Sequence, residues 1–251
     1  MNNISLKTKE QIEIMARGGK ILAKILNEVR LEAKVGTKLS DLELKARDLI
    51  KKNNAKPAFL GHNRYPAALC ASPNDMIVHG IPGEYILQNG DILSLDLGIQ
   101  YEGLFTDMAI TIGIGEIDEE KARLIRVAKK ALKRAIKKMR PGNTIGDIGN
   151  TIERYVSKRG LFVIKELCGH GIGKELHEDP EILNYGSRGT GPVLKEGMVL
   201  CVEPMVSAGT EHIKLGKDGF AYYTMDNSLV AHFEHTIAIT KNGSRVLTEI
   251  E

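Results

Sequence analysis

Residues 87–96 read LQNGDILSLD, and residues 194–203 read LKEGMVLCVE. When the second stretch is shifted back by 107 positions, two leucines and a glycine coincide, and the stretches end in Asp96 and Glu203. Each stretch contains a short apolar run, which is typical of a buried β-strand. The pair therefore predicts two copies of one strand, each ending on a carboxylate.

The residues before these strands repeat as well. Thr8 and Gln11 form a capping box, and apolar residues at helical spacing follow it as far as Val29. A second helical stripe covers residues 39–50. A shift of 106 positions maps the residues that precede and line this second helix onto later ones: Gly36, Leu39, Asp41, Leu42 and Ile50 onto Gly142, Ile145, Asp147, Ile148 and Val156.

This repeat predicts the fold class. Two helices followed by antiparallel strands, present twice, indicate an α+β fold in which the helices cover one face of a shared sheet. We expect a single domain over residues 1–251, with internal halves at about 8–113 and 118–251.

The composition is that of an ordinary globular protein, with 42% hydrophobic and 27% charged residues. A net charge of +3, from 35 basic and 32 acidic residues, is too small for a general nucleic-acid-binding protein. The three cysteines are widely spaced and form no CxxC pair, which disfavours a disulfide framework. No signal peptide and no run of about 18 apolar residues is present, so we expect an unanchored cytoplasmic protein.

The run DILSLDLGIQYEGLFTDMAITIG, residues 91–113, predicts a β-hairpin that carries two aspartates. If its centre lies between Tyr101 and Glu102, Asp96 faces Asp107 across the two strands. Directly opposed side chains lie about 5 Å apart, where two carboxylates repel each other unless a proton or a cation lies between them. The hairpin therefore indicates a site for a divalent metal, although the two aspartates could also flank a solvated hairpin.

The stretch CGHGIGKELHED, residues 168–179, places His170 and His177 seven positions apart. Three glycines around the first histidine disfavour a helix, so we expect a strand or loop whose backbone approaches another segment closely. A zincin HExxH motif is excluded, because HEDPE contains no second histidine. The partners of His170 must come from elsewhere in the chain.

Two further acids complete an oxygen-rich set. Glu203 ends an apolar strand, and Glu234 precedes the alternating segment HTIAIT. With Asp96, Asp107 and His170 they make a ligand set that is too large for one tetrahedral zinc and suits two ions with bridging carboxylates. Such a pair of ions is typical of metal-assisted hydrolysis.

Five motifs resemble the type I methionine aminopeptidases, in family order and over nearly the whole chain. These motifs are HGIP (79–82), LDLGIQYEGLFTDMA (95–109), CGHGIGKELHEDP (168–180), EGMVLCVEPM (196–205) and EHTIAIT (234–240). The resemblance implies the pita-bread fold and removal of the initiator methionine from nascent proteins by a cytoplasmic, monomeric enzyme that prefers a small second residue. It also implies two divalent metal ions, with Mn, Fe(II), Co or Zn as candidates. The implied metal ligands are Asp96, Asp107, His170, Glu203 and Glu234.

The resemblance further implies roles for side chains around these ligands. His79 contacts the substrate, His177 hydrogen-bonds the scissile peptide, and Glu203 is both a ligand and a proton shuttle. Tyr65 and Cys70 stand where the family has walls of the methionine pocket, whereas four other wall positions hold residue types that differ from well-known members: Phe59, His62, Leu176 and Phe220. We expect Cys168 and Cys201 to belong to the core.

Alternative functions and partners stay open at this point. Prolidases, proline aminopeptidases and creatinase share the fold and the ligands, and some relatives are inactive binding modules. Residues 126–140, RVAKKALKRAIKKMR, carry eight basic and no acidic residues opposite an apolar face. This run predicts a helix with a solvated outer face or, for an enzyme that meets emerging chains, a transient contact with ribosomal RNA.

Overall fold

The structure is a computed structural model that describes residues 4–249. The helices are α1 (Lys9–Glu32), α2 (Leu39–Lys52), the 3-10 turn η1 (His62–Arg64), α3 (Glu119–Ile136) and α4 (Ile145–Ser157). The strands of the first half are β1 (Lys56–Pro57), β2 (Leu69–Pro73), β3 (Met76–Val78), β4 (Ile92–Tyr101) and β5 (Leu104–Gly113). The strands that follow α4 are β6 (Phe162–Val163), β7 (Cys168–Gly171), β8 (Glu178–Leu183), β9 (Val199–Val202), β10 (Met205–Ser207), β11 (Ile213–Leu215), β12 (Tyr222–Thr224), β13 (Val230–His232), β14 (His235–Thr240) and β15 (Gly243–Val246).

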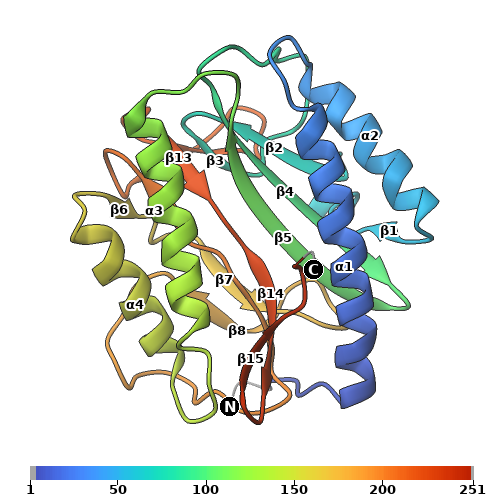
Figure 1. The fold of residues 1–251 in the computed structure, drawn as a ribbon, viewed down its shortest axis with the longest axis vertical. Coiled ribbons are helices and arrows are strands. Elements are labelled where there is room, and N and C mark those ends of the chain that lie inside the picture. The colour runs from blue at the N-terminus through green and yellow to red at the C-terminus, as the bar shows by residue number, and fades with distance from the viewer. Residues whose placement is uncertain (1–3, 250–251) are drawn as a thin grey trace.

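The order of two helices followed by strands occurs twice, which confirms the predicted α+β fold. Figure 1 shows α1 and α2 on one side of the molecule and α3 and α4 on the other, with the long strands between them. The predicted capping box at Thr8 and Gln11 is present at the start of α1. None of the helices within residues 4–249 is both long enough and apolar enough to cross a lipid bilayer.

The loops before α2 and α4 make equivalent hydrogen bonds. The N–H of Gly36 donates to the carbonyl of Leu87 at 2.8 Å, and the N–H of Gly142 donates to the carbonyl of Leu194 at 3.1 Å. Both glycines have a φ of 89°, in the region where a side chain is strained. Residues that match at offsets of 106 and 107 in the sequence therefore take the same place in both halves.

Within the described residues 4–249 all strand pairs are antiparallel, and the strands form four sheets. Two of these sheets hold the long strands: β1, β2 and β5 all pair with β4, and the order in the other is β15-β14-β9-β7-β8. The smaller sheets have the orders β13-β10-β6 and β11-β12-β3. The first two sheets carry the predicted metal ligands on β4, β5, β7 and at the ends of β9 and β14.

The hairpin of β4 and β5 has a different register from the predicted one. Asp107 lies opposite Gly98, and Asp96 lies opposite Ala109. The predicted direct pairing of the two aspartates was therefore wrong by two positions. The cause is the turn, since Glu102 (φ 48°) and Gly103 (φ 82°) both take the positive φ that a two-residue hairpin turn requires. A shift of two residues keeps both carboxylates on one face of the sheet, as diagonal neighbours.

The two halves meet where β5 runs beside residues 232–236, a contact that we call the seam. The N–H of Glu234 donates to the carbonyl of Ala109 at 2.9 Å. The Thr236 hydroxyl accepts from the N–H of Asp107 at 2.9 Å and donates to its carbonyl at 2.8 Å. The Thr111 hydroxyl likewise donates to the carbonyl of His232 and accepts from its N–H, both at 2.8 Å. Two predicted metal ligands, Asp107 and Glu234, thus lie on opposite sides of the seam.

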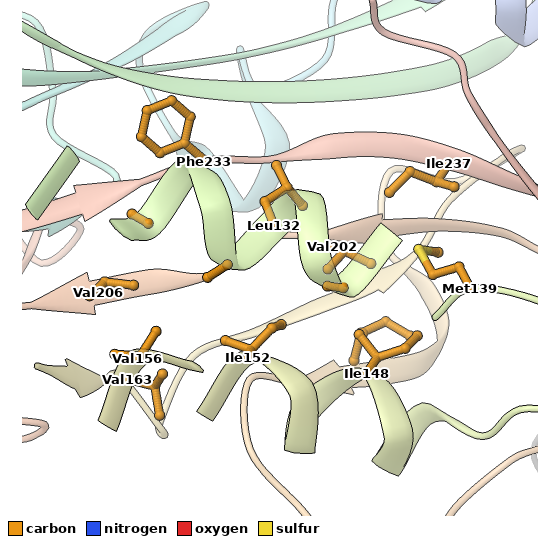
Figure 2. Close-up of a cluster of buried hydrophobic side chains, with 14 of the residues drawn as sticks. Leu132, Met139, Ile148, Ile152, Val156, Val163, Val202, Val206, Phe233 and Ile237 are labelled. Carbon is orange, nitrogen blue, oxygen red and sulfur yellow. The ribbon is translucent and has the colours of Figure 1, made fainter. Parts of the chain in front are cut away.

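A hydrophobic core holds α3 and α4 against the strands of the second half (Figure 2). Leu132 of α3, Ile148 and Ile152 of α4 and Val202 of β9 belong to this core, and all four are buried. Each buried side chain of this size contributes about 1.5–3 kcal/mol. Because Glu203 directly follows β9, this core fixes the backbone that carries it.

Candidate active site

The first half supplies two buried carboxylates. The exposed fractions are 9% for Asp96 of β4 and 3% for Asp107 of β5. One oxygen of each lies within 4.8 Å of the other and of a carboxylate oxygen of Glu234, which comes from the far side of the seam.

The second half supplies a histidine and two glutamates. His170 on β7 lies opposite Cys201 on β9, and Glu203 follows that strand. The His170 Nε2 is 3.8 Å from a Glu203 oxygen. Ligand atoms of His170, Cys201 and Glu234 also lie within 4.8 Å of one another. The five predicted ligands therefore come together, from five strands or strand ends, around one point.

The glycines of the histidine loop allow this assembly. A Cβ atom on Gly169 would lie 2.2 Å from the carbonyl oxygen of Cys201, and one on Gly171 would lie 2.2 Å from that of Asp179. Both distances are shorter than any side chain tolerates, so glycine lets β7 approach its neighbours on both sides. The expected strand with a closely packed backbone is confirmed.

The tautomer of His170 follows from its hydrogen bond. Its Nδ1 lies 2.9 Å from the carbonyl oxygen of Gly171, which can only accept, so Nδ1 carries the proton. In a neutral ring with this tautomer, the Nε2 that lies near Glu203 has the free lone pair. A backbone carbonyl that holds the other ring nitrogen is the usual arrangement of a metal-binding histidine.

The electrostatics of the cluster favour a bound cation. Burial, together with the neighbouring carboxylates, raises the pKa of Asp96, Asp107 and Glu234 above the ordinary range, and burial raises that of Glu203. Among residues 4–249, the Oδ1 of Asp96 and the Oε1 of Glu234 are buried without a hydrogen-bond partner. A divalent cation would satisfy these oxygens and offset the repulsion, so the donor set fits a divalent metal site.

The carboxylate cluster lies in the wall of a cavity of about 650 Å³. Every residue that the sequence predicted for the site lines this cavity. These residues are the five predicted metal ligands, the seven other residues predicted to be catalytic or to bind substrate, and the pocket-wall position Leu176. The predicted residues are Phe59, His62, Tyr65, Cys70, His79, Asp96, Asp107, His170, Leu176, His177, Glu203, Phe220 and Glu234.

Three histidines face the cavity beside the cluster. The rings of His177 and His170 are 4.4 Å apart and nearly perpendicular, and the His177 Nδ1 lies 3.2 Å from the Nε2 of His62. His79 has a φ of 57°, and its ring packs edge-on against Tyr222. Desolvation lowers the pKa of His79, and desolvation with the nearby His170 lowers that of His177 to about 3. His177 is therefore neutral at pH 7.

One part of the cavity wall is apolar. Phe59, Tyr65 and Cys70 are buried, and the Tyr65 ring packs edge-on against Phe220 with 5.7 Å between centroids. The Tyr65 hydroxyl donates to the carbonyl of Gly80 at 2.8 Å. This wall offers aromatic faces and a thiol to a flexible apolar side chain.

The two remaining cysteines differ from each other. Cys201 is fully buried, which confirms the expectation that it belongs to the core. Cys168 was expected in the core as well, but it is half-buried and lines the cavity. The prediction for Cys168 was wrong because this first residue of β7 borders the cavity instead of packing into the core.

Sequence reasoning missed His232. This residue is 1% exposed, and its Nε2 lies 3.4 Å from a Glu203 oxygen. Neither ring nitrogen has a hydrogen-bond partner within the part of the chain that the structure describes. The available signal was its place two residues before Glu234, on the same face of an extended segment.

The basic run of α3 contributes to a second cavity, which lies between α3 and α4 and has a volume of about 360 Å³. None of its described lining residues is acidic. The guanidinium groups of Arg134 and Arg159 lie 4.5 and 3.6 Å from the Tyr155 ring centroid. Its six basic lining residues are Arg134, Lys138, Arg154, Lys158, Arg159 and Arg188.

Residues 13–241 match the model of metallopeptidase family M24. The methionine aminopeptidase of Clostridium acetobutylicum is 45% identical over 249 residues, which are 99% of this chain and 100% of that protein. The crystal structure of the methionine aminopeptidase from Thermotoga maritima is 44% identical, with a TM-score of 0.97 over 98% of this chain and 99% of that one. The prolidase of Pyrococcus horikoshii is more distant, at 26% identity and a TM-score of 0.78, and this chain covers only 64% of it.

Proposed function

We propose that this chain, which belongs to metallopeptidase family M24, binds peptides in its cavity and hydrolyses the peptide bond after an initiator methionine. Relatives named methionine aminopeptidase are 38–45% identical over the full length, so the chain is an aminopeptidase that removes the initiator methionine. The observation that carries the residue assignments is that every side chain in them lines one cavity. The alternative of a prolidase is disfavoured by lower identity and partial coverage.

We assign two divalent metal ions to the carboxylate cluster. Its buried oxygens without partners and its mixture of carboxylates with one imidazole suit Mn, Fe(II) or Co, with Zn as a further candidate. When bound, such ions supply Lewis acidity to the scissile carbonyl and a water nucleophile at neutral pH. The proposed ligands are Asp96, Asp107, His170, Glu203 and Glu234.

Glu203 is proposed to move the proton during hydrolysis. Its carboxylate lies at the cavity wall, 3.8 Å from the His170 ring and 3.4 Å from the His232 ring. From there it can accept a proton from the attacking water and return it to the leaving amine. Glu203→Gln should therefore damage proton transfer as well as metal binding.

His177 and His79 are proposed to hold the substrate peptide. A neutral His177 presents an N–H to the cavity, which suits a hydrogen bond to the scissile peptide as its charge develops. His79 is positioned on the same cavity, where it can contact the peptide near the new amino terminus. A side chain at the second position must fit beside His79 and the metal centre, so we expect Gly, Ala, Ser, Thr, Cys, Pro and Val to be preferred there.

The methionine side chain is proposed to lie against the apolar wall. Tyr65, Phe59 and Phe220 provide aromatic surface, and thioethers contact aromatic rings favourably. Cys70 adds a small, soft surface at the base of this wall, and His62 lies at its margin.

A peptide assay tests the assignment. A Met-Gly-Met peptide should be cleaved in the presence of divalent metal and not after exhaustive chelation, and an Ala-Pro peptide should be a poor substrate. A Met-Leu peptide is the matched control for second-residue size. Preference for Ala-Pro would favour a prolidase-like activity, and no cleavage of any peptide with any metal would favour a binding module.

We propose further that the enzyme acts in the cytoplasm as a monomeric, single-domain protein with halves at about 8–113 and 118–251. We also propose that it contacts the ribosome through the cavity between α3 and α4, where six basic residues converge without an acidic neighbour in the lining. Binding to purified ribosomes should weaken steeply with salt, and a double charge reversal at Arg134 and Arg154 should weaken it at low salt. Unchanged binding by that variant would contradict the contact.

A further inference from the structure

Three imidazole rings follow one another along one wall of the cavity. The centroids of His62 and His177 are 5.1 Å apart, and those of His177 and His170 are 4.4 Å apart. A hydrogen bond of 3.2 Å joins His62 Nε2 to His177 Nδ1, between residues 115 positions apart in the chain. The wall residue His62 is therefore bonded directly to the histidine assigned to the scissile peptide.

This hydrogen bond decides which His177 nitrogen is available to a substrate. Because Nδ1 is engaged by His62, Nε2 is the nitrogen left to face the cavity. A neutral imidazole has one N–H and one lone pair. If His177 is to donate from Nε2, its Nδ1 must accept, and the His62 Nε2 must be the donor.

We propose that His62 is a positioning residue that donates from Nε2 to His177 Nδ1, and thereby holds His177 in the tautomer whose Nε2–H points at the substrate. The proposal rests on the hydrogen-bonding role given to His177 above. Without this donor, His177 would populate both tautomers, and the other one presents a lone pair to the scissile carbonyl.

The backbone around His62 is built to hold the ring in place. The N–H of His62 donates to the carbonyl of Phe59 at 2.9 Å, and its own carbonyl accepts from the N–H of Tyr65 at 2.8 Å. The two residues that follow it, Asn63 (φ 45°) and Arg64 (φ 67°), both have left-handed backbone. Left-handed conformations cost about 1–2 kcal/mol per non-glycine residue and persist where the surrounding structure enforces them, often at functional sites.

His62 lines the cavity and was also predicted as a wall of the methionine pocket, and the two roles predict different kinetics. A wall residue contributes to binding of the methionine side chain, so its loss raises KM. A residue that sets the tautomer of a transition-state donor contributes mainly to kcat. The separation of kcat from KM therefore distinguishes them.

The test uses two substitutions of similar size. His62→Leu removes the donor and keeps apolar volume, whereas His62→Gln keeps an N–H close to the place of Nε2. On Met-Gly-Met with saturating metal, His62→Leu should lower kcat about 10-fold, at the lower end of losses seen when a partner that orients a functional histidine is removed. KM, metal content and thermal unfolding should be unchanged, and His62→Gln should recover most of kcat.

NMR reads the tautomer without reference to turnover. In protein labelled with ¹⁵N-histidine and loaded with diamagnetic Zn²⁺, the two ring nitrogens of His177 have shifts that report which one carries the proton. His177→Ala identifies the signals by their absence. The wild type and His62→Gln should have the proton on Nε2, and His62→Leu should have a mixture.

Two outcomes would overturn the proposal. One is a His62→Leu protein with an unchanged tautomer and an unchanged kcat, with or without a raised KM. The other is an equal loss of kcat from His62→Leu in the wild type and in a His177→Ala background, since coupled residues do not act additively. A wild-type protein that cleaves no methionyl peptide while its tautomer is as described would refute the proposed function instead.

Discussion

The strand pair β4–β5 and the strand pair β9–β14 take corresponding places in the two halves, but their connections differ. β4 and β5 pair over their whole length, from Ile92 with Gly113 to Tyr101 with Leu104, and a two-residue turn joins them. β9 and β14 pair over only four positions, and residues 203–234 lie between them. That excursion contains β10 to β13 and brings Phe220, Tyr222 and His232 to the cavity or its edge.

This difference in connections matches a difference in role between the proposed metal centre and the segments proposed to contact the peptide. Both strand pairs carry acids that face the same point, so the repeated part of the fold builds the proposed metal centre. Several of the side chains proposed to meet the peptide come from the excursion and from the loop that carries His177, whereas Cys70 lies on β2, which pairs with β4 as β7 pairs with β9. We therefore expect the duplicated strands to hold the reactive centre and the unequal connections to contribute to what is bound.

The largest effect is expected when one predicted metal ligand is removed from either half. Asp107→Ala and Glu234→Ala should each abolish measurable turnover and lower the bound metal, because each leaves buried carboxylates around a lost or misplaced ion. Metal analysis beside kcat/KM on Met-Gly-Met checks this. Turnover that survives exhaustive chelation would contradict the requirement for metal. Full metal content and activity in either variant would show that the two acids do not both act as ligands.

The next effect distinguishes a predicted metal ligand, His170, from a predicted substrate-binding residue, His177. His170→Ala should lower metal content and activity together, since a ligand is lost. His177→Ala should keep both metals and lower kcat by roughly 10²- to 10³-fold with little change in KM, as for a lost transition-state donor. If His177→Ala loses metal as readily as His170→Ala, the two roles are wrongly divided.

A smaller effect concerns the seam. Thr236→Val removes the hydroxyl that bonds both backbone groups of Asp107, and an unsatisfied buried amide costs about 1–3 kcal/mol. We expect a loss of about 2 kcal/mol, or about 4–8 °C in Tm for a chain of this size. Thr240→Val, which removes a hydroxyl at a half-buried strand end, is the control. Equal Tm values for the two variants would mean that the seam bond contributes nothing.

The smallest effect compares equivalent helix starts. Thr144 caps α4 in a capping box with Asp147, whereas the corresponding residue of α2, Lys38, makes no side-chain cap although Asp41 is in place. Thr144→Ala should cost about 1 kcal/mol, and Lys38→Thr should gain roughly 0.5 kcal/mol by transplanting the box. The lost surface ion pair of Lys38 with Glu84 should matter little. Denaturant unfolding measures both, and a destabilised Lys38→Thr would show that the two starts are not interchangeable.

The fold could be predicted because it depends on local patterns that occur twice. The spacing of Asp96 and Glu203 identified the repeat, and residue types together with the family resemblance predicted the acids and His170 as ligands, which the structure brings to one cavity. The hairpin register could not be predicted in the same way. It depends on the positive φ of Glu102 and Gly103, and a Glu-Gly pair is a weaker signal for that turn than Asn-Gly.

The features that were missed depend on contacts between distant segments. His62 was predicted as a pocket wall from its position, but its bond to His177 joins the turn after β1 to the loop between β7 and β8. His232 looked like one more residue of an apolar strand until the fold placed it beside Glu203. No periodicity reports such contacts, because each depends on how two halves or two loops pack.

The seam has a consequence for the integrity of the enzyme. Asp96 and Asp107 come from one side of it, while His170, Glu203 and Glu234 come from the other, and the connection between the halves is the short stretch 114–118. Neither side holds the assigned ligand set by itself. Turnover therefore reports whether the two halves are assembled. If the chain were cut within that stretch and produced as two pieces, each piece alone should cleave no peptide. Activity should return when the two pieces associate, as in a split reporter.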